Sequence, residues 1–286
     1  FTLCNFCRPY YPPVIGTGAT GIAYSNGDIA MRADRARTAF GVTGAGVKVG
    51  VLSDSYNTIT GNPALANVQN GDLPGIQNPN NSNPVQVSKE YPYGIRTDEG
   101  RAMLQIVHDV APDAELAFRT GFISAGDLAK GITQLGIDDD CDVIVDDITF
   151  ITEPFFQDGV VARAVNQVAD HGVAYFTAAG NYGNKSYEGT FLPTVAPQGI
   201  FGVPHDFGGG DIFQHLTLGR GSYTIVLQWE DSIYSLGQLP GALTDLDIYL
   251  VDNDGTVLFG FNRDNIWGDP VEVLSFSVRA PTSANI

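Results

Sequence analysis

Residues 97–112 read TDEGRAMLQIVHDVAP and predict a helix around which the rest of the chain is organised. Thr97 and Asp98 form a helix-start signal, and Pro112 ends the segment because proline cannot continue a helix. Glu99 stands at the start of the expected helix, either as an N-terminal cap or as a chemical group. The apolar residues at helical spacing, expected to form a buried stripe, are Met103, Ile106, Val107 and Val110.

Strand and helix signals alternate on both sides of this helix. Short runs with strand character occupy residues 47–52, 85–88, 115–119, 142–147 and 173–178. Further helical segments are expected at residues 29–40, 124–135 and 158–171, and residues 57–84 are expected to form a long loop. This alternation predicts an α/β fold with a mainly parallel sheet flanked by helices. In such a sheet, ligands and reactive groups gather at the carboxyl ends of the strands.

The pattern changes after about residue 200. Residues 223–229, 246–250, 256–261 and 271–278 alternate apolar and polar side chains, and Asn253-Asp254-Gly255 is a hairpin signal. These features predict an additional antiparallel β-sandwich module. The expected organisation is a leader at residues 1–28, an α/β domain at 29–200 and the β-sandwich module at 201–286.

Composition limits the partners that the chain is expected to have. The 32 acidic and 15 basic residues give a net charge of -17 and a pI near 4.3. This balance argues against nucleic acid and anionic membrane as partners, and no apolar run approaches the ~18 residues of a membrane span. The acidic balance suits a secreted protein. Because the chain begins at Phe1 without a signal peptide, we expect a processed form or an excised fragment.

Three cysteines add little to this picture. Cys4 and Cys7 form a C-x-x-C without nearby metal ligands, which predicts a local disulfide or two inert thiols. Cys141 precedes an apolar strand and is expected at the edge of the core. The cysteines therefore indicate no metal site.

Residues 30–200 resemble a subtilisin-type peptidase of the subtilase superfamily. GAGVKVGVLSDS at 44–55 resembles the segment that carries the catalytic aspartate of this family, which falls on Asp54. AAGN at 178–181 resembles the segment whose asparagine donates to the oxyanion, which falls on Asn181. APDAEL at 111–116 is similar to the turn and strand that follow the catalytic-histidine helix. Together these segments imply a subtilisin-like sheet with a site at its carboxyl edge.

A fourth segment implies where the substrate binds. VIVDDIT at 143–149 is similar to the strand that pairs with the substrate backbone, so the resemblance places Asp147, Ile148 and Thr149 beside the substrate. Asp147 has two interpretations, as a member of an acidic pocket or as the cap of a strand end.

The chain departs from this family at the base and at the nucleophile. Where the H-G-T motif of the family begins, the chain has Glu99-Gly100-Arg101, as in the sedolisin branch with its Ser-Glu-Asp triad. Sedolisins replace the oxyanion asparagine by aspartate, so a chain that keeps Asn181 looks intermediate. The G-T-S segment of the nucleophile is absent. Ser283 follows Pro281-Thr282 without a strand-turn-helix context and is not assigned, so the rest of the parent chain is expected to supply the serine.

The base itself has alternative assignments. A glutamate has a reference pKa of ~4.3, and neighbouring carboxylates raise it. Asp54, Asp146 and Asp147 are the candidates for this effect on Glu99. His108 lies nine residues after Glu99, a rotation of ~900° along a helix, and is expected to face the opposite side as a surface or helix-end residue.

DLDIYLVD at 245–252 resembles a strand of the pre-peptidase C-terminal or P-type domains. Asp245 and Asp247 share one strand face, and Asp252 lies on the following turn. Calcium prefers such oxygen clusters, which makes it the candidate cofactor. The alternative is a solvated strand face.

The resemblance implies a secreted, subtilisin-like serine endopeptidase that acts on a protein or peptide substrate, with Glu99 in place of the catalytic histidine. A catalytically inactive pseudopeptidase or a protein-binding module is the alternative, so the sequence leaves open whether the chain is an enzyme. A glycosidase would use Glu99 with an aspartate, but it would give Asn181 no role.

Overall fold

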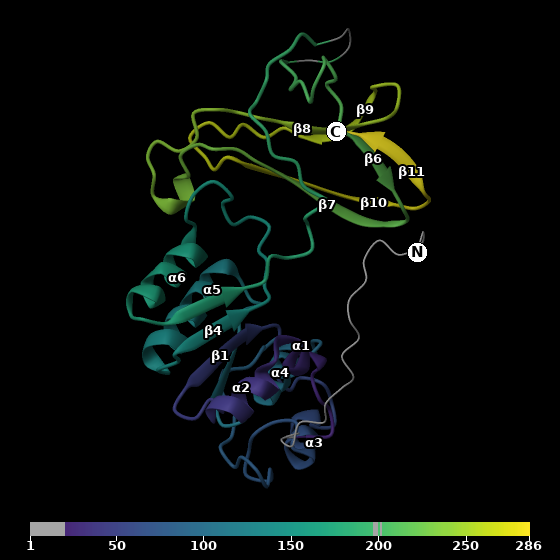
Figure 1. Ribbon diagram of the computed structural model, residues 1–286. Helices are drawn as coiled ribbons and strands as arrows, with labels where there is room; N and C mark the ends of the chain where they lie inside the picture. Colours follow the sequence, from purple (N-terminus) through teal and green to yellow (C-terminus); the bar gives the residue numbers. More distant parts are fainter. Residues whose placement is uncertain (1–20, 197–199, 201) are drawn as a thin grey trace. The chain divides into compact units, whose positions relative to one another are not determined.

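The structure is a computed structural model that describes residues 21–196, 200 and 202–286 (Figure 1). The chain divides into two compact units. The first holds the chain up to Thr149 together with Val161–Gly180, and the second holds Phe150–Val160 and Asn181–Ile286. A folding boundary at residue 200 stays a prediction. Cys4, Cys7 and most of the expected leader lie outside the described residues.

A five-stranded parallel sheet forms the centre of the first unit, which confirms the predicted α/β class. In spatial order its strands are β2 (Gln86–Lys89), β3 (Glu115–Thr120), β1 (Lys48–Ser53), β4 (Val143–Asp146) and β5 (Ala174–Thr177). Every residue of β1 after Lys48 is buried, because this strand is central and both its faces are covered.

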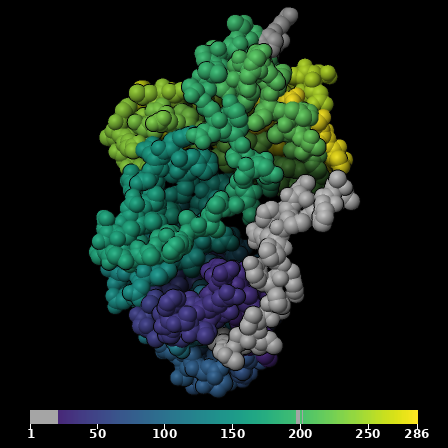
Figure 2. All heavy atoms as spheres, in the orientation of Figure 1, coloured from purple at the N-terminus to yellow at the C-terminus, as the bar shows by residue number. Residues whose placement is uncertain are grey.

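The helices of the first unit are α1 (Asn26–Met31), α2 (Ala33–Phe40), α3 (Pro63–Asn70), α4 (Glu99–Val110), α5 (Ala125–Thr133) and α6 (Val160–Asp170). A π-helical turn, Gln134–Asp138, follows α5. The helix expected at residues 29–40 is interrupted because Arg32 adopts a left-handed conformation with φ 62°. The expected loop at 57–84 contains α3. Figure 2 shows α1 and α2, coloured purple, on the surface of this unit.

Helices α4 and α5 cover opposite faces of the sheet. A Cβ placed on Gly100 of α4 would meet Phe118, and one placed on Gly131 of α5 would meet Arg119. Phe118 and Arg119 are neighbours on β3, and neighbouring residues of a strand point to opposite faces. Helix α4 therefore packs on the face of the sheet that carries Phe118, and α5 packs on the face that carries Arg119. None of the helices in the described part of the chain is both long and apolar enough to cross a bilayer.

The buried face of α4 differs from the predicted stripe. Gly100, Leu104 and His108 are buried, four residues apart, whereas Ile106 is 50% exposed. The predictions of a buried Ile106 and of a surface His108 are therefore wrong. The reason is Gly100, whose missing side chain lets the first turn of α4 approach β3 closely and so fixes the helix rotation.

This close approach predicts a large effect of a single methyl group. The Cβ of Gly100→Ala would lie 2.3 Å from Cε2 of Phe118 and 2.8 Å from the carbonyl oxygen of Ser55. We expect the variant to lose about 1–3 kcal/mol of unfolding free energy, measured by urea denaturation, because overpacking forces the helix away from the sheet. Gly126→Ala is the matched control in α5, where a Cβ would meet nothing within 4 Å. It should be neutral or stabilising by up to ~1 kcal/mol. Equal destabilisation of both variants would contradict the packing argument.

The second unit consists of antiparallel sheets. Its strands are β6 (His215–Leu218), β7 (Gly221–Gln228), β8 (Ile248–Val251), β9 (Val257–Phe261), β10 (Val271–Val278) and β11 (Thr282–Asn285). One sheet pairs β10 with β7, and the other has the order β6-β11-β8-β9. Side chains from both sheets form one apolar cluster. Its buried members are Leu218, Ile248, Leu250, Leu274 and Ala284.

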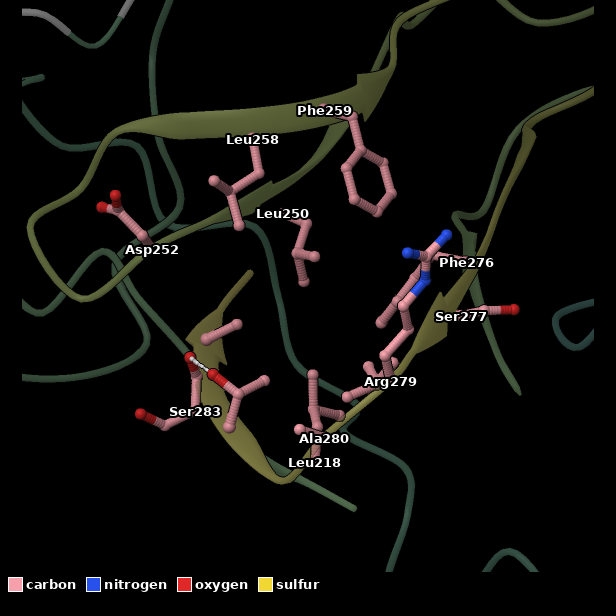
Figure 3. Close-up of a pocket in the computed structure, with 13 residues that line it drawn as sticks. Leu218, Leu250, Asp252, Leu258, Phe259, Phe276, Ser277, Arg279, Ala280 and Ser283 are labelled. Carbon is pink, nitrogen blue, oxygen red and sulfur yellow. Dashed lines mark hydrogen bonds between the residues drawn. The ribbon is translucent and has the colours of Figure 1, made fainter. Parts of the chain in front are cut away.

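An open cavity of about 330 Å³ adjoins this cluster (Figure 3). Leu218, Leu250 and Phe259 supply apolar lining, and Arg279 and Asp252 are among its polar residues. Its lining comes from both sheets.

Candidate active site

The carboxylate of Asp54 holds the start of α4. Asp54 follows β1 directly and is 7% exposed. Its Oδ1 accepts the backbone N–H groups of Ser55 (2.5 Å) and Glu99 (3.0 Å), and its Oδ2 accepts the backbone N–H (2.8 Å) and hydroxyl (2.5 Å) of Thr97. The first N–H groups of a helix have no partner within the helix, so this carboxylate caps α4 from the position directly after β1.

These hydrogen bonds keep Asp54 ionised. Burial by itself raises the pKa of a carboxyl group, but the donors from Thr97, Glu99 and Ser55 outweigh it and lower the pKa of Asp54 below its ordinary value of 3.8. A carboxylate that accepts several N–H bonds is stabilised in its charged form. Asp54 is therefore a fixed negative charge beside the first residue of α4.

Glu99 is brought to Asp54 through its backbone, while its own carboxylate is turned to another partner. Glu99 Oε2 accepts the hydroxyl of Ser53 at 2.9 Å, and Glu99 is exposed. Ser53 is the last residue of β1 and is completely buried. The structure thus places an accessible carboxylate, oriented by a buried hydroxyl, at the carboxyl end of the central strand. Ser53 was not predicted as a site residue, and its only signal in the sequence was its position directly before Asp54.

A second buried carboxylate, Asp98, orders the loop after β1. Its Oδ1 accepts the hydroxyl of Ser55 (2.9 Å) and the backbone N–H of Thr58 (2.8 Å), and its Oδ2 pairs with Arg101. Burial by itself raises the pKa of Asp98, but the hydrogen bonds from Arg101 and Thr58 outweigh burial and lower the pKa from 3.8 to about 2. Asp98 also has a positive φ of 54°, a conformation that few residues other than glycine adopt.

Glu90 completes this set of carboxylates. It accepts the backbone N–H groups of Tyr56 (3.0 Å) and Asn57 (2.7 Å). Asp54, Asp98 and Glu90 together bind the loop after β1 through backbone N–H groups. Sequence reasoning could not identify this role for Asp98 or Glu90, because the loop N–H groups that they accept lie more than 30 residues away along the chain.

The expected substrate strand is shorter than predicted. β4 ends at Asp146, so Asp147, Ile148 and Thr149 follow the strand. Asp146 pairs with Leu52 in register, which places the following residues at the same edge of the sheet as Asp54. Asp147 and Thr149 are exposed.

Asp146 itself is buried and serves its neighbours on β5. It accepts the hydroxyls of Tyr175 (2.6 Å) and Thr177 (3.0 Å). Burial, together with the charge of Asp146, raises the pKa of Tyr175 above its ordinary value. Asp146 therefore connects β4 to β5 through these side-chain hydrogen bonds.

Asn181 follows β5 and is exposed. It belongs to the second unit, whereas Asp54 and Glu99 belong to the first. The convergence of Asn181 with the two acidic residues stays a prediction.

The acidic residues predicted to hold calcium have separate partners. Asp245 accepts the backbone N–H of Asn265 (3.0 Å), and Asp252 accepts those of Asp254 (3.0 Å) and Thr256 (2.8 Å). Asp247 accepts the hydroxyl of Tyr249 at 3.3 Å. Within residues 21–196, 200 and 202–286, no group of three or more His, Cys, Asp or Glu side chains is arranged to hold a metal ion. Calcium binding stays a prediction.

Ser283 has none of the surroundings of an activated nucleophile. It lies in β11, and its hydroxyl oxygen accepts a hydrogen bond from Nδ2 of Asn253 at 2.9 Å. An amide cannot accept and carry a proton as a catalytic base does. Asn253 therefore does not activate Ser283 as a nucleophile.

Comparison of the chain with protein-family models gave no match. A comparison with curated proteins gave no significant match either.

Proposed function

We propose that this chain carries part of the active site of a secreted serine endopeptidase with a subtilisin-like fold, in which Glu99 is the general base. The observation that supports this proposal best is the arrangement at the carboxyl end of β1. The Glu99 carboxylate is accessible and accepts the Ser53 hydroxyl, while the ionised Asp54 accepts the Glu99 backbone N–H. A general base requires this combination of access and fixed orientation.

In the proposed reaction, the nucleophile is a serine that these 286 residues do not supply. As its Oγ bonds to the scissile carbonyl carbon, Glu99 takes the hydroxyl proton. Glu99 then gives this proton to the leaving amine as the C–N bond breaks. A water molecule attacks the acyl-enzyme, gives a proton to Glu99 and releases the acid, and the proton returns to the serine. The Asn181 amide would donate to the oxyanion, and residues 147–149 would bind the substrate backbone.

A catalytically inactive pseudopeptidase or protein-binding module is the second candidate function. It is favoured by the number of donors to Asp54, because three backbone N–H groups and the Thr97 hydroxyl already occupy the carboxylate of the proposed triad. Such a carboxylate would be retained for the fold even without chemistry. The subtilisin-like fold, the β-sandwich arrangement of the second unit, secretion and calcium binding belong to this proposal and rest on the sequence resemblance.

The test compares two glutamates in a full-length protein that includes the serine. We expect Glu99→Gln to lower kcat/KM for a fluorogenic peptide by roughly 10²–10⁴-fold, because glutamine cannot accept the proton. Glu115→Gln is the matched control, since Glu115 is exposed at the start of β3, whereas the proposed site lies at the carboxyl ends of the strands. It should leave kcat/KM unchanged, and the 286-residue chain alone should not hydrolyse casein.

Two outcomes would reject the peptidase proposal. Equal activity of wild type and Glu99→Gln would remove Glu99 from the mechanism. A full-length protein that binds peptides without cleaving them would favour the protein-binding module instead.

A further inference from the structure

An arginine at the candidate site is held between two aromatic rings. The guanidinium carbon of Arg96 lies 4.2 Å from the ring centroid of Phe122 and 4.8 Å from that of Tyr91. Its backbone N–H donates to the hydroxyl of Thr58 at 2.9 Å. Cation–π contacts with two rings fix the position of the guanidinium group without neutralising its charge.

The guanidinium group of Arg96 is also unpaired. Its Nε is buried without a hydrogen-bond partner, and no ion pair joins Arg96 to a carboxylate of the described residues. By contrast, Arg37, Arg101 and Arg119 each pair with an aspartate. What distinguishes Arg96 is that its guanidinium carbon lies against two rings while its Nε is buried without a hydrogen-bond partner. A buried donor without a partner carries a desolvation cost that a ligand can remove.

Arg96 lies at the same edge of the sheet as the proposed base. It stands three residues before Glu99, while Tyr91 follows the end of β2 and Phe122 follows the end of β3. The carboxyl ends of parallel strands meet at one edge, so these residues gather beside the proposed active site.

Exposed apolar side chains accompany Arg96. Tyr93 is 72% exposed, Ile95 is 64% exposed and Phe122 is 44% exposed. These exposed apolar side chains are available to contact a ligand that binds Arg96. The ring contacts leave the edge of the guanidinium group, with its parallel N–H donors, as the group that can receive a ligand.

We propose that Arg96 binds a carboxylate of the peptide substrate and so gives the site a preference for acidic residues. The planar fork of arginine matches the two oxygens of a carboxylate, which explains the preference for this group over a neutral amide. The inference rests on the proposed function in so far as it calls the peptide a substrate. Binding of the peptide carboxylate can be tested without catalysis.

The test uses three fluorescein-labelled, Ala-rich octapeptides and the 286-residue chain. The first peptide has one central glutamate and an amidated C terminus, the second replaces this glutamate by glutamine, and the third has the glutamine and a free C-terminal carboxylate. Fluorescence anisotropy gives each Kd, and NMR follows the Nε–H signal of Arg96. We expect a peptide that carries a carboxylate to bind about tenfold more tightly than the amidated glutamine peptide, about 1.4 kcal/mol. The first and third peptides distinguish a side-chain carboxylate from a chain terminus.

Variants identify the residue that is responsible. Arg96→Gln should abolish the tenfold preference, and Arg96→Lys should retain only part of it, because an ammonium group lacks the planar fork. Arg35→Gln removes the same charge from exposed α2 and should keep the full preference. Equal Kd values for all three peptides, failure of all of them to bind, or an unchanged preference in Arg96→Gln would overturn the inference.

The two proposals fail in different ways. Glu99-dependent hydrolysis by the full-length protein without any carboxylate preference would keep the proposed function and reject the role of Arg96. A carboxylate preference that depends on Arg96, in a full-length protein without hydrolysis, would keep the role of Arg96 and reject the peptidase.

Discussion

Raising the pH from about 4.5 to 7 is expected to destabilise the second unit by about 2–3 kcal/mol through Glu272. Glu272 is completely buried in β10, and its Oε1 accepts the backbone N–H of Arg263 at 3.1 Å. Its Oε2 has no hydrogen-bond partner among the described residues. Burial, and then the nearby charges of Asp247 and Asp245, raise the pKa of Glu272 from 4.5 to about 7.

The sign of the effect follows from the raised pKa. Between pH 4.5 and 7 the folded unit keeps a proton on Glu272 that the unfolded chain has lost, so a rising pH favours unfolding. The stabilising contribution is complete below about pH 4.5 and is lost as the pH rises through about 7. Each unit of pKa corresponds to ~1.4 kcal/mol, which sets the size of the effect.

Tryptophan fluorescence measures this unit separately, because both tryptophans of the chain, Trp229 and Trp267, belong to it. Urea denaturation at several pH values should show that Glu272→Gln removes the loss of stability between pH 4.5 and 7. Glu230→Gln, at an exposed position of the same unit, should retain the loss. An identical pH dependence in wild type and Glu272→Gln would contradict the assignment.

Lowering the pH below about 6.5 is expected to destabilise the first unit through His108. His108 is completely buried in α4, and neither ring nitrogen has a hydrogen-bond partner among the described residues. Burial lowers its pKa from 6.5, although the charges of Asp113 and Asp72 act in the opposite direction. Below pH 6.5 the folded unit therefore holds a neutral imidazole where the unfolded chain holds a charged one. The contribution of the neutral His108 to stability is fully present above pH 6.5 and is lost as the pH falls.

His108→Leu tests this prediction by removing both unpaired nitrogens from the apolar face of α4. We expect the variant to gain about 1–3 kcal/mol at pH 7, the cost of unsatisfied buried polar groups, and to lose the acid-dependent fall in stability. Hydrogen exchange of the amides in β1 and β3 measures the first unit separately. His171→Leu is the control, since His171 is exposed and its Nδ1 lies 2.8 Å from the carbonyl oxygen of Gln167. A His108→Leu variant that still loses stability on acidification would reject His108 as the cause.

Glu99 and His108 together limit the pH range in which the proposed activity can be observed. Glu99 has to be ionised to act as a base, which sets an acid limb for the reaction. We expect His108 to make the unit that carries Glu99 less stable over part of the same acid range. Activity and hydrogen exchange therefore have to be measured together, because loss of the fold and protonation of the base would otherwise give the same acid limb.

The alternation of strands and helices, and with it the α/β class, was determined by the sequence alone. The prediction for residues 271–278 agrees with β10, and Asn253-Asp254-Gly255 lies at the turn between β8 and β9. Gly255 has φ 80°, a conformation that glycine adopts without strain. These features were predictable because side-chain periodicity and turn residues act over a few neighbouring positions.

The proximity of Asp54 and Glu99 was also expected from the sequence, through the position of each residue at the end of an element and through the family resemblance. The partner of each carboxylate was not. Asp54 accepts backbone N–H groups, and Glu99 accepts the hydroxyl of Ser53. Local patterns identify where a carboxylate lies along the chain but not which donors a distant segment presents to it.

Tertiary structure alone decided the rotation of α4, the burial of His108 and the place of Arg96 between two rings. The apolar residues of α4 allow several buried faces, and the contact of Gly100 with Phe118 selects one of them. Tyr91, Arg96 and Phe122 meet because β2, α4 and β3 end or begin at the same edge of the sheet. Helical periodicity limits which faces can be buried, whereas close packing with residues distant in sequence determines which face is buried and which side chains meet there.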